Sequence, residues 1–520
     1  MQLSPMIALV APAALALAAA ICLRSKGRRP RVAMNVAQAL AFVALLASLG
    51  ALAVVIAGGT QAGPRAGWAG VGVAVRLDAI SVTMLLLVSF IGWVVIRFSA
   101  TYLDGEERQG AFAGWLCATL ASVLLLVQAG TLTLLVIAWV LTSLFLHRLL
   151  LFYPERPGAR RAAHKKFIMA RLGDLAMVGA AMLLLAACGS DDIGTILDRA
   201  RTAESGGLMP WAAGLLAVAA MLKSATFPTG GWLTEVMEAP TPVSALLHAG
   251  VINAGGFLLI RLADVILTAP VVMAVLVAMG GFTAIVAGLV MLTQSAVKTS
   301  LAWSTMAQMG FMLMQCGLAL FPLALLHIVA HSLYKAHAFL ASGRAVENVA
   351  SIARPGPVAA PGLLAVSRAF ALALVIYVAV GAMFGFAGKS PQALALGAIL
   401  IFGTAYLLAQ GMAGLAPRAL SWRMALYAMV VAVGYFALQS LAEALTASVL
   451  PPAPTPGALE WTLIVLALTS FGAVAFAQSA FPLWSAHPAA AGLRIHLTNG
   501  LYANALLDRL LRGWLRQPMS

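Results

Sequence analysis

The residues best suited to chemistry include a group of ionisable side chains that follows an apolar run. The group comprises Lys223, Glu235, Glu238 and His248. Ionisable groups inside a membrane segment are costly to bury and usually mark a pathway for protons or ions. The group therefore predicts proton or ion transfer. The alternative for the two glutamates is a wet turn, and the alternative for His248 is a satisfied core position.

Helix breakers stand in the same stretch, which runs from Lys223 to Asn253. Pro228 has no backbone N–H and its ring clashes with the carbonyl one turn earlier, so a helix through Lys223 must break about five residues later. Pro240 and Pro242 interrupt the turns that follow. Lipid cannot satisfy the freed backbone groups, so the break must face protein or water, as in the discontinuous helices of ion-coupled transporters.

A second group recurs at four-residue intervals and consists of His327, His331 and Lys335. This spacing places the three along one helical face, with about 12 Å between the first and the last. Imidazoles gain and lose protons near neutral pH and a buried lysine can join them, so the row predicts a proton relay. The rival hypothesis makes the histidines metal ligands, but no acidic residue or cysteine stands nearby in sequence to complete such a site. His337 falls off this face and is interpreted as a packing or interface residue.

Two further ionisable residues stand in or beside apolar runs. Asp174 lies inside a predicted span, where its carboxylate could pair with Lys223; the alternative is a structural ion pair with Arg171 one turn earlier. Lys389 stands near a span interrupted by glycine and proline, and the alternative there is a lysine that snorkels at a helix end. Lys223 and Lys389 stand in two halves of the core, which is typical of inverted-topology repeats with a working site between them.

The composition is that of a polytopic helical membrane protein. Hydrophobic residues make up 62% of 520, charged residues make up 9%, and the mean hydropathy is +0.97, which indicates no soluble domain. The net charge of +15 comes from basic residues in short loops, so it predicts topology and not nucleic-acid binding. The four cysteines are isolated, which argues against a disulfide framework or a cysteine metal site. The first apolar stretch lacks a small-residue cleavage site and is predicted to be a retained helix.

About fifteen apolar segments are long enough to span a bilayer. They are predicted at residues 5–23, 32–57, 77–98, 110–129, 131–152, 165–187, 209–226, 244–266, 270–292, 297–318, 321–341, 363–387, 391–413, 424–447 and 461–482. Lys and Arg, including Arg354, gather in the loops 24–31, 153–166, 342–367 and 414–423, which all fall on one side. The positive-inside rule then places the amino terminus outside and the carboxyl terminus in the cytoplasm.

Residues 483–520 are predicted to form a cytoplasmic amphipathic tail. One helical face carries Leu501, Ala505, Leu506, Leu510 and Leu511, while Arg509, Arg512 and Arg516 fall elsewhere. Such a helix either lies on the membrane or packs on the protein's own loops, since both use the same apolar stripe. The other predicted parts are the N-terminal helices (1–109), a conducting core of two inverted repeats (110–420) and the C-terminal helices (421–482).

Several of these segments resemble a known family. KSA with the proline after it, WLTEVMEAPTPVSALLHAGVINAGG and HSLYKAHAFLASG are similar to the proton-conducting membrane subunits shared by respiratory complex I and Mrp-type cation/proton antiporters. Within that family they most resemble the DabB-type subunit of the DAB inorganic-carbon accumulation complex. The resemblance implies an all-α antiporter-like fold with broken helices. It also implies proton transfer through Asp174 of an RxGD motif, Lys223, the histidine, histidine and lysine row, and Lys389 of a glycine-phenylalanine-x-x-lysine motif.

The resemblance also implies a partner. DabB-type subunits pair with a large cytoplasmic DabA-type zinc protein that resembles a β-carbonic anhydrase, and the complex draws on an H+ or Na+ gradient to make CO2 hydration one-way. This chain would then be no enzyme and would hold no cofactor, because zinc and hydration chemistry belong to the partner, and it would lie in the bacterial inner membrane. The alternative is a pumping subunit of complex I or an Mrp antiporter. A third hypothesis is a non-conducting membrane anchor for a cytoplasmic enzyme.

One departure from the family pattern concerns the fifth span. Antiporter-like subunits carry a glutamate just after the tryptophan of this span, paired with the lysine of the broken helix. Here Trp139 is followed by Val140, and the span holds no acid. The usual pair cannot form. We therefore expect Asp174, Glu235 or Glu238 to replace the glutamate, or the first half-channel to differ.

Overall fold

The computed structural model describes residues 4–68, 71–202, 207–344, 361–412 and 418–515, and this part of the chain is almost entirely helical. In it, 13 helices are long and apolar enough to cross a membrane. The other two predicted spans are also helices, of which α8 (Met209–Lys223) is shorter and α14 (Val297–Gly317) contains more polar residues. The predicted all-α membrane fold is therefore confirmed.

The helices follow the apolar segments because backbone groups in lipid must be satisfied within their own segment. The first part of the chain forms η1 (Pro5–Leu9), α1 (Val10–Arg24), α2 (Arg31–Gly58), α3 (Ala79–Tyr102), α4 (Gln109–Val127), α5 (Leu132–Leu150), α6 (Pro157–Cys188) and α7 (Ile193–Arg201). After α8 come α9 (Gly231–Glu235), η2 (Val236–Glu238), α10 (Thr241–Ala249), η3 (Val251–Asn253), α11 (Ala254–Arg261), α12 (Ala263–Leu267), α13 (Pro270–Met291) and, after α14, α15 (Phe321–Leu340) and η4 (Ala341–Arg344). The last part forms α17 (Leu363–Met383), η5 (Phe386–Gly388), α18 (Pro391–Gly411), α19 (Arg418–Thr446), α20 (Ala458–Ser479), α21 (Phe481–Trp484), α22 (Pro488–Thr498), η6 (Gly500–Tyr502) and α23 (Ala503–Leu515).

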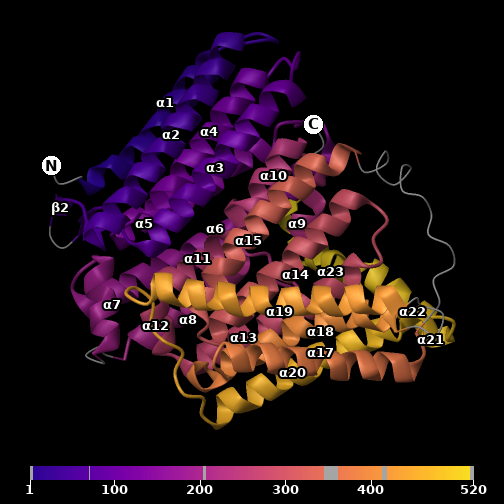
Figure 1. Cartoon of the computed structure of the whole chain (residues 1–520). Helices are drawn as coiled ribbons and strands as arrows, with labels where there is room; N and C mark the ends of the chain where they lie inside the picture. Colours follow the sequence, from indigo (N-terminus) through magenta and orange to yellow (C-terminus); the bar gives the residue numbers. More distant parts are fainter. Residues whose placement is uncertain (1–3, 69–70, 203–206, 345–360, 413–417, 516–520) are drawn as a thin grey trace.

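The only strands in the described residues lie between α2 and α3. β1 (Gln61–Ala62) pairs antiparallel with β4 (Arg76–Leu77), and β2 (Ala66–Trp68) pairs antiparallel with β3 (Val71–Val73). The two short strand pairs lie together at one end of the bundle and are not part of the membrane-spanning helices (Figure 1).

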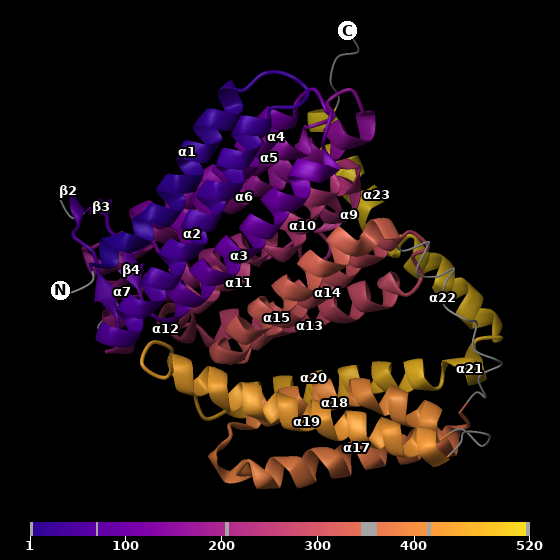
Figure 2. The same ribbon diagram turned by 45° about the horizontal axis from the view of Figure 1, so that its top comes forward.

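The bundle has a large part and a smaller part. Helices α1 to α15 share one apolar core, whereas α17, α18 and α19 surround a second core. Figure 2 shows α17 to α20 (orange to yellow) as a layer beside α13, α14 and α15. A third cluster, made of apolar side chains from α13, α14, α15, α18 and α20, joins the two parts and is here called the apolar seam.

The helix ends define two faces of the molecule. The loops 25–30 and 151–156 lie at one of them, here called the basic face. The strands, α7 and the start of the chain lie at the opposite face, while α23 lies at the basic face, as an odd number of crossings requires (Figure 2). Which face meets the cytoplasm stays a prediction from the positive-inside rule. Arg354, which contributed to that prediction, lies outside the described residues.

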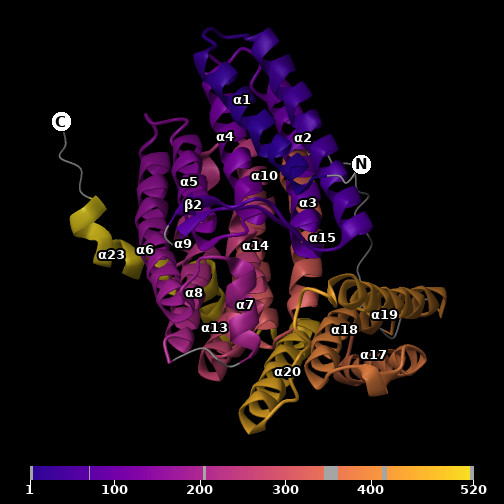
Figure 3. The same ribbon diagram turned by 90° about the vertical axis from the view of Figure 1, so that its left-hand side faces the viewer.

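The end of the chain runs back across the basic face as a C-terminal strap (residues 481–515). Figure 3 places α23 and α19 on opposite sides of the molecule, so the strap links the smaller part to the distant α6 and α9. Lys165 of α6 is fully buried and binds Asp508 of the strap at 2.6 Å and Glu235 of α9 at 2.7 Å. Leu507 packs on the main core while Leu506 and Leu510 stay exposed. The strap therefore packs on the protein, and the side chains of residues 511–520, Arg516 among them, lie outside the described part.

Replacing Lys165 by alanine is expected to loosen the strap, because two carboxylates then face each other without a cation. A hydrogen bond to a charged group contributes about 1.5–3 kcal/mol to stability. Because Glu235 and Asp508 are partly exposed, we expect a loss at the lower end of this range. Local opening of α23 should become about tenfold more frequent. Limited proteolysis of the strap in membranes measures this opening, with the exposed Lys26→Ala as the matched control. An unchanged cleavage rate in Lys165→Ala would contradict the prediction.

A buried ion pair joins α3 and α11 at the opposite face. Asp78 caps α3 by accepting from the Ser81 backbone N–H at 2.9 Å, and Arg261 donates to the same carboxylate at 2.5 Å. Burial raises the pKa of Asp78, but the charge and hydrogen bond of Arg261 and the bonds from Ser81 outweigh burial and hold this pKa well below its usual range. Arg76 adds a second guanidinium at 3.0 Å. The pair is a candidate anchor of the membrane-embedded core.

Candidate proton pathway

The helix that carries Lys223 is broken where the prolines stand. α8 ends at Lys223, the chain unwinds around Pro228, and it becomes helical again at Gly231. At Gly230 a side chain would meet the Ala225 carbonyl oxygen at 2.0 Å, so only glycine lets the chain turn back there. A second break follows α10 at Gly250. These breaks leave the end of α8 facing the interior of the bundle.

Lys223 points from this break towards α5. Its amine donates to the Ser143 hydroxyl at 2.8 Å and lies 4.3 Å from the centre of the Trp139 ring. A hydroxyl and an indole face therefore surround the lysine at the level where the family pattern has a glutamate. Among the described residues Lys223 donates no hydrogen bond to a carboxylate.

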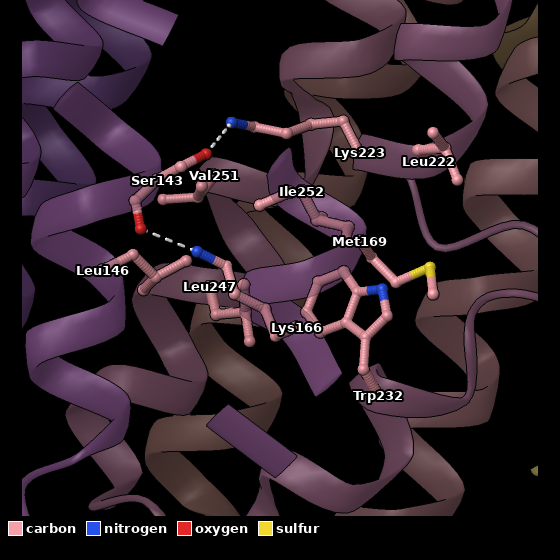
Figure 4. Close-up of a pocket in the computed structure, with 11 residues that line it drawn as sticks. Ser143, Leu146, Lys166, Met169, Leu222, Lys223, Trp232, Leu247, Val251 and Ile252 are labelled. Carbon is pink, nitrogen blue, oxygen red and sulfur yellow. Dashed lines mark hydrogen bonds between the residues drawn. The ribbon is translucent and has the colours of Figure 1, made fainter. Parts of the chain in front are cut away.

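A second lysine reaches the same point. Lys166 of α6 is buried, and its amine donates to the Ser143 carbonyl at 2.8 Å. Lys166 and Lys223 line one cavity, together with Trp232 and apolar side chains of α6, α8, α10 and η3 (Figure 4). The cavity offers about 20 Å³ to water centres, which is room for about one water molecule. One water can thus contact both amines.

The three acids expected near Lys223 lie in two places. Asp174 pairs with Arg171 at 2.7 Å and also lies close enough to Lys223 to interact electrostatically. Glu235 and Glu238 stay at the basic face, where they bind Lys165 and Arg156; the second of these contacts measures 3.5 Å. Asp174 is therefore the only one of the three acids that lies near Lys223. The ion pair with Arg171, which was the alternative for Asp174, is present too.

The row on α15 is continuous. His327 and His331 have ring centres 6.0 Å apart, and His327 Nδ1 lies 2.8 Å from Gln315 Oε1. Lys335 is fully buried and donates to the Leu301 carbonyl at 3.2 Å. Within the described residues no group of three His, Cys, Asp or Glu could hold a metal ion, so the metal hypothesis gains no third ligand.

His248 connects this row to the broken segment. His331 Nε2 lies 3.2 Å from the His248 carbonyl oxygen, and the His248 ring stacks on Phe339 at 4.4 Å. The ring is fully buried, and both its nitrogens lack a hydrogen-bond partner among the described residues. It also interacts electrostatically with Lys335. The alternative for His248 was a core residue whose ring nitrogens are hydrogen-bonded, and the unpartnered nitrogens of this ring do not fit that alternative.

Lys389 lies apart from the row. Its amine binds Glu443 Oε2 of α19 at 2.9 Å and donates to the Ser440 hydroxyl at 3.1 Å. The apolar seam stands between α15 and α18, and the described residues show no polar contact from the row to Lys389. The structure thus brings the α15 row and His248 together, places Lys223 near Asp174, and leaves Lys389 with a separate partner.

Sequence reasoning missed Ser143, Lys166, Gln315 and Glu443. A signal existed for Glu443, because it is the only acidic residue in the predicted span 424–447 and an intramembrane acid predicts a site. The sequence predicts Lys166 only as one of the basic residues of the loop 153–166. For Ser143 and Gln315 the apolar pattern gives no signal, since polar residues that bond a neighbouring helix look like any others in a span.

Comparison with known families gives two matches. The family described as "NADH:quinone oxidoreductase/Mrp antiporter, TM" matches residues 129–416. The family described as "NADH-Ubiquinone oxidoreductase (complex I), chain 5 N-terminus" matches residues 66–113. The first match covers Lys166, Asp174, Lys223, His248, the α15 row and Lys389.

The similar proteins of known name fall into two groups. The "Probable inorganic carbon transporter subunit DabB2" of Halothiobacillus neapolitanus is 34% identical over 455 residues, which are 85% of this chain and 80% of that protein. The "Probable inorganic carbon transporter subunit DabB" of Hydrogenovibrio crunogenus is 42% identical over 276 residues, 53% of each chain. The "NADH-quinone oxidoreductase subunit L" of Escherichia coli is 33% identical over 278 residues, 52% of this chain and 44% of that protein.

Two solved structures share the fold. A chain of the Mrp complex from Dietzia sp. aligns over 98% of this chain and 59% of its own, with a TM-score of 0.65 and 22% identity. A chain of the archaeal membrane-bound sulfane sulfur reductase aligns over 90% and 75%, with a TM-score of 0.55 and 19% identity. At these identities the likeness concerns the arrangement of helices alone.

Proposed function

The chain belongs to the family of membrane subunits shared by NADH:quinone oxidoreductases and Mrp antiporters, and from this membership we propose that it is the cation-conducting subunit of an inorganic-carbon transporter. The similarity to DabB-type subunits over 85% of the chain supports the inorganic-carbon branch. The observation that carries conduction is the cluster of titratable side chains inside the bundle. The ring centres of His327 and His331 lie 6.0 Å apart, His331 also contacts the His248 backbone carbonyl at 3.2 Å, and Lys335 is buried one turn further along α15.

The proposed cation is H+ and not Na+. Na+ is a hard cation and needs several oxygen ligands, whereas the groups inside the bundle are mostly amines and imidazoles, and the Asp174 carboxylate is paired with Arg171. The charges of Lys166, Lys223 and Lys335 would repel a metal cation, but each amine can hold and release a proton. The single-water cavity between Lys166 and Lys223 suits the same purpose, since water carries protons between groups that do not touch.

The proposed partner is a cytoplasmic DabA-type zinc protein that resembles a β-carbonic anhydrase. In that arrangement this chain lets protons run down their gradient in the inner membrane, and the partner hydrates CO2 and releases bicarbonate. For its share of this work the chain offers the buried amines of Lys166 and Lys335 and the imidazoles of the α15 row. The basic face, with its strap, would meet the partner if that face is cytoplasmic.

Growth rescue tests this function. A bacterium that lacks carbonic anhydrase should grow at ambient CO2 when it carries this chain with its cytoplasmic partner. The variant Lys335→Ala, which removes the buried end of the row, is expected to lose the rescue. Arg199→Ala changes an exposed residue of α7 at the opposite face and should keep it. Both variants must first be found in the membrane with the partner bound.

Each outcome separates the hypotheses. Rescue by the wild type and loss in Lys335→Ala support conduction through the row. Rescue by all variants would leave a membrane anchor in place of a conductor. Failure of the wild type to rescue would exclude the inorganic-carbon function, and the Mrp antiporter alternative would then be tested by sodium tolerance in an antiporter-deficient strain.

A further inference from the structure

A histidine that takes no part in the proposed row lies on the same face of α5 as the partners of Lys223. Trp139, Ser143 and His147 follow at four-residue intervals, so they share one helical face. Trp139 and Ser143 contact Lys223. His147 lies one turn before α5 ends at the basic face. The face therefore leads from the surface of the molecule to the Lys223 cavity.

His147 faces α6 and is only partly exposed. Its ring centre lies 6.4 Å from that of His164 and 5.0 Å from that of Phe167. The titratable and charged groups that interact with it are Lys166 and His164 of α6 and Arg148 of α5 itself. The Nδ1 atom is buried without a hydrogen-bond partner among the described residues. His147 thus packs against the turn of α6 that carries the half-buried His164, the buried Lys166 and Phe167, where the Ala163 backbone also hydrogen-bonds the ring.

The cavity lined by Lys166 and Lys223 needs a proton-exchanging group that connects it to the basic face. The fifth span carries no acid, and Glu235 and Glu238 at the basic face are bound by Lys165 and Arg156. Lys166 lines the cavity on the side of α6 and shares Ser143 with Lys223. A group that exchanges protons with water at the basic face and lies next to Lys166 would complete the path.

We infer that His147, with His164 beside it, is the proton-exchange site between the basic face and the Lys166 and Lys223 cavity. This inference rests on the proposed function and adds to it the residues that serve the first half of the pathway. The two imidazoles take over proton transfer from the fifth-span glutamate of the family pattern. They can do so because a neutral imidazole accepts a proton at one nitrogen and releases one from the other.

The transfer is balanced in protons and involves no electrons. Water at the basic face gives a proton to one ring nitrogen of His147, and the other ring nitrogen gives its proton to a bridging water. That water protonates the neutral amine of Lys166, and the cavity water passes a proton from Lys166 to Lys223. A flip of the His147 ring then exchanges its two nitrogens and restores the tautomer that can accept the next proton from the face. The reverse sequence carries protons out.

Proton flux in everted membrane vesicles that contain the complete complex tests the inference. The flux is started by CO2 and followed with a pH-sensitive dye for the wild type, His147→Ala, His147→Phe and Lys335→Ala. His147→Phe keeps an aromatic ring against Phe167 but holds no proton. His337→Ala changes an exposed histidine on α15 and serves as the matched control.

Both His147 variants are expected to lose about 100-fold in flux, the lower end of the range for loss of a positioned proton-transfer group. Added imidazole should restore flux in His147→Ala, where the ring has left a space, and not in His147→Phe. A merely structural role would not give this rescue. His337→Ala should keep the wild-type rate.

Two results would overturn the inference in distinguishable ways. If the wild type conducts, Lys335→Ala is inactive and His147→Phe keeps the wild-type rate, His147 carries no protons and the proposed function stands without it. The same conclusion follows if imidazole rescues neither variant. If the wild-type complex shows no CO2-dependent flux, the proposed function fails and the inference falls with it.

Discussion

Replacing Lys223 by alanine is expected to reduce CO2-dependent proton flux by about 100-fold or more, the range for loss of a positioned proton-transfer group. The amine is the only charged group that the broken helix brings to Ser143 from α8, and it lines the cavity that it shares with Lys166. Alanine removes the proton carrier and the contact with the Trp139 ring together. The flux is measured in vesicles that contain the complex, after quantification of the protein in the membrane.

The variant Lys223→Arg distinguishes a need for proton release at position 223 from a need for a fixed positive charge. Arginine keeps the positive charge and can still donate to Ser143, but its guanidinium does not release a proton in proteins. We therefore expect Lys223→Arg to be nearly as inactive as the alanine variant, and the exposed Arg199→Ala at the opposite face to remain active. Full activity in Lys223→Arg would mean that the position supplies only a fixed charge.

Replacing Arg261 by alanine is expected to have the largest effect on stability. Removing one partner of a buried ion pair costs about 3–5 kcal/mol because the other charge stays buried and uncompensated. Arg76 remains on the Asp78 carboxylate, so the lower end, about 3 kcal/mol, applies. Thermal unfolding of the purified protein in detergent measures the loss, with the exposed Arg28→Ala as control. A midpoint equal to that of the wild type would contradict the prediction.

The pH dependence of this pair follows from the low pKa of Asp78. A carboxyl whose folded-state pKa is depressed contributes stability that is present above its unfolded pKa, about 3.9, and lost as the pH falls through the folded value. The difference in stability between wild type and Arg261→Ala should therefore stay constant from about pH 8 to pH 5. A difference that fades between pH 7 and pH 5 would show that Asp78 is not held in its charged form.

The sequence was sufficient for the architecture because hydropathy and helix breakers are local properties. All fifteen predicted spans are helices, and the chain breaks around Pro228. The spacing of His327, His331 and Lys335 also placed them on one face, since the helical period fixes which residues of one helix are neighbours. These predictions needed no knowledge of how one helix packs on another.

The contacts between helices could not be predicted in this way. Glu235 was a candidate partner of Lys223, yet it binds Lys165, because the unwound segment carries it to the basic face. Lys166 belongs to the predicted basic loop 153–166, yet it is buried beside Ser143. Which face of α5 meets α6 and α8 depends on the packing of the whole bundle. The pairing of Lys389 with a residue of α19 depends on it as well.

The apolar seam has a consequence for the voltage across the membrane. It lies between the α15 row and the helices beside Lys389, and leucines such as Leu323 and Leu396 contribute to it. A dry hydrophobic constriction does not conduct, whereas the same constriction conducts once water fills it. In electrical terms the seam is an insulator in series with two conductors. Under the proposed function, a seam that stays dry would preserve the membrane voltage even when protons occupy both ends.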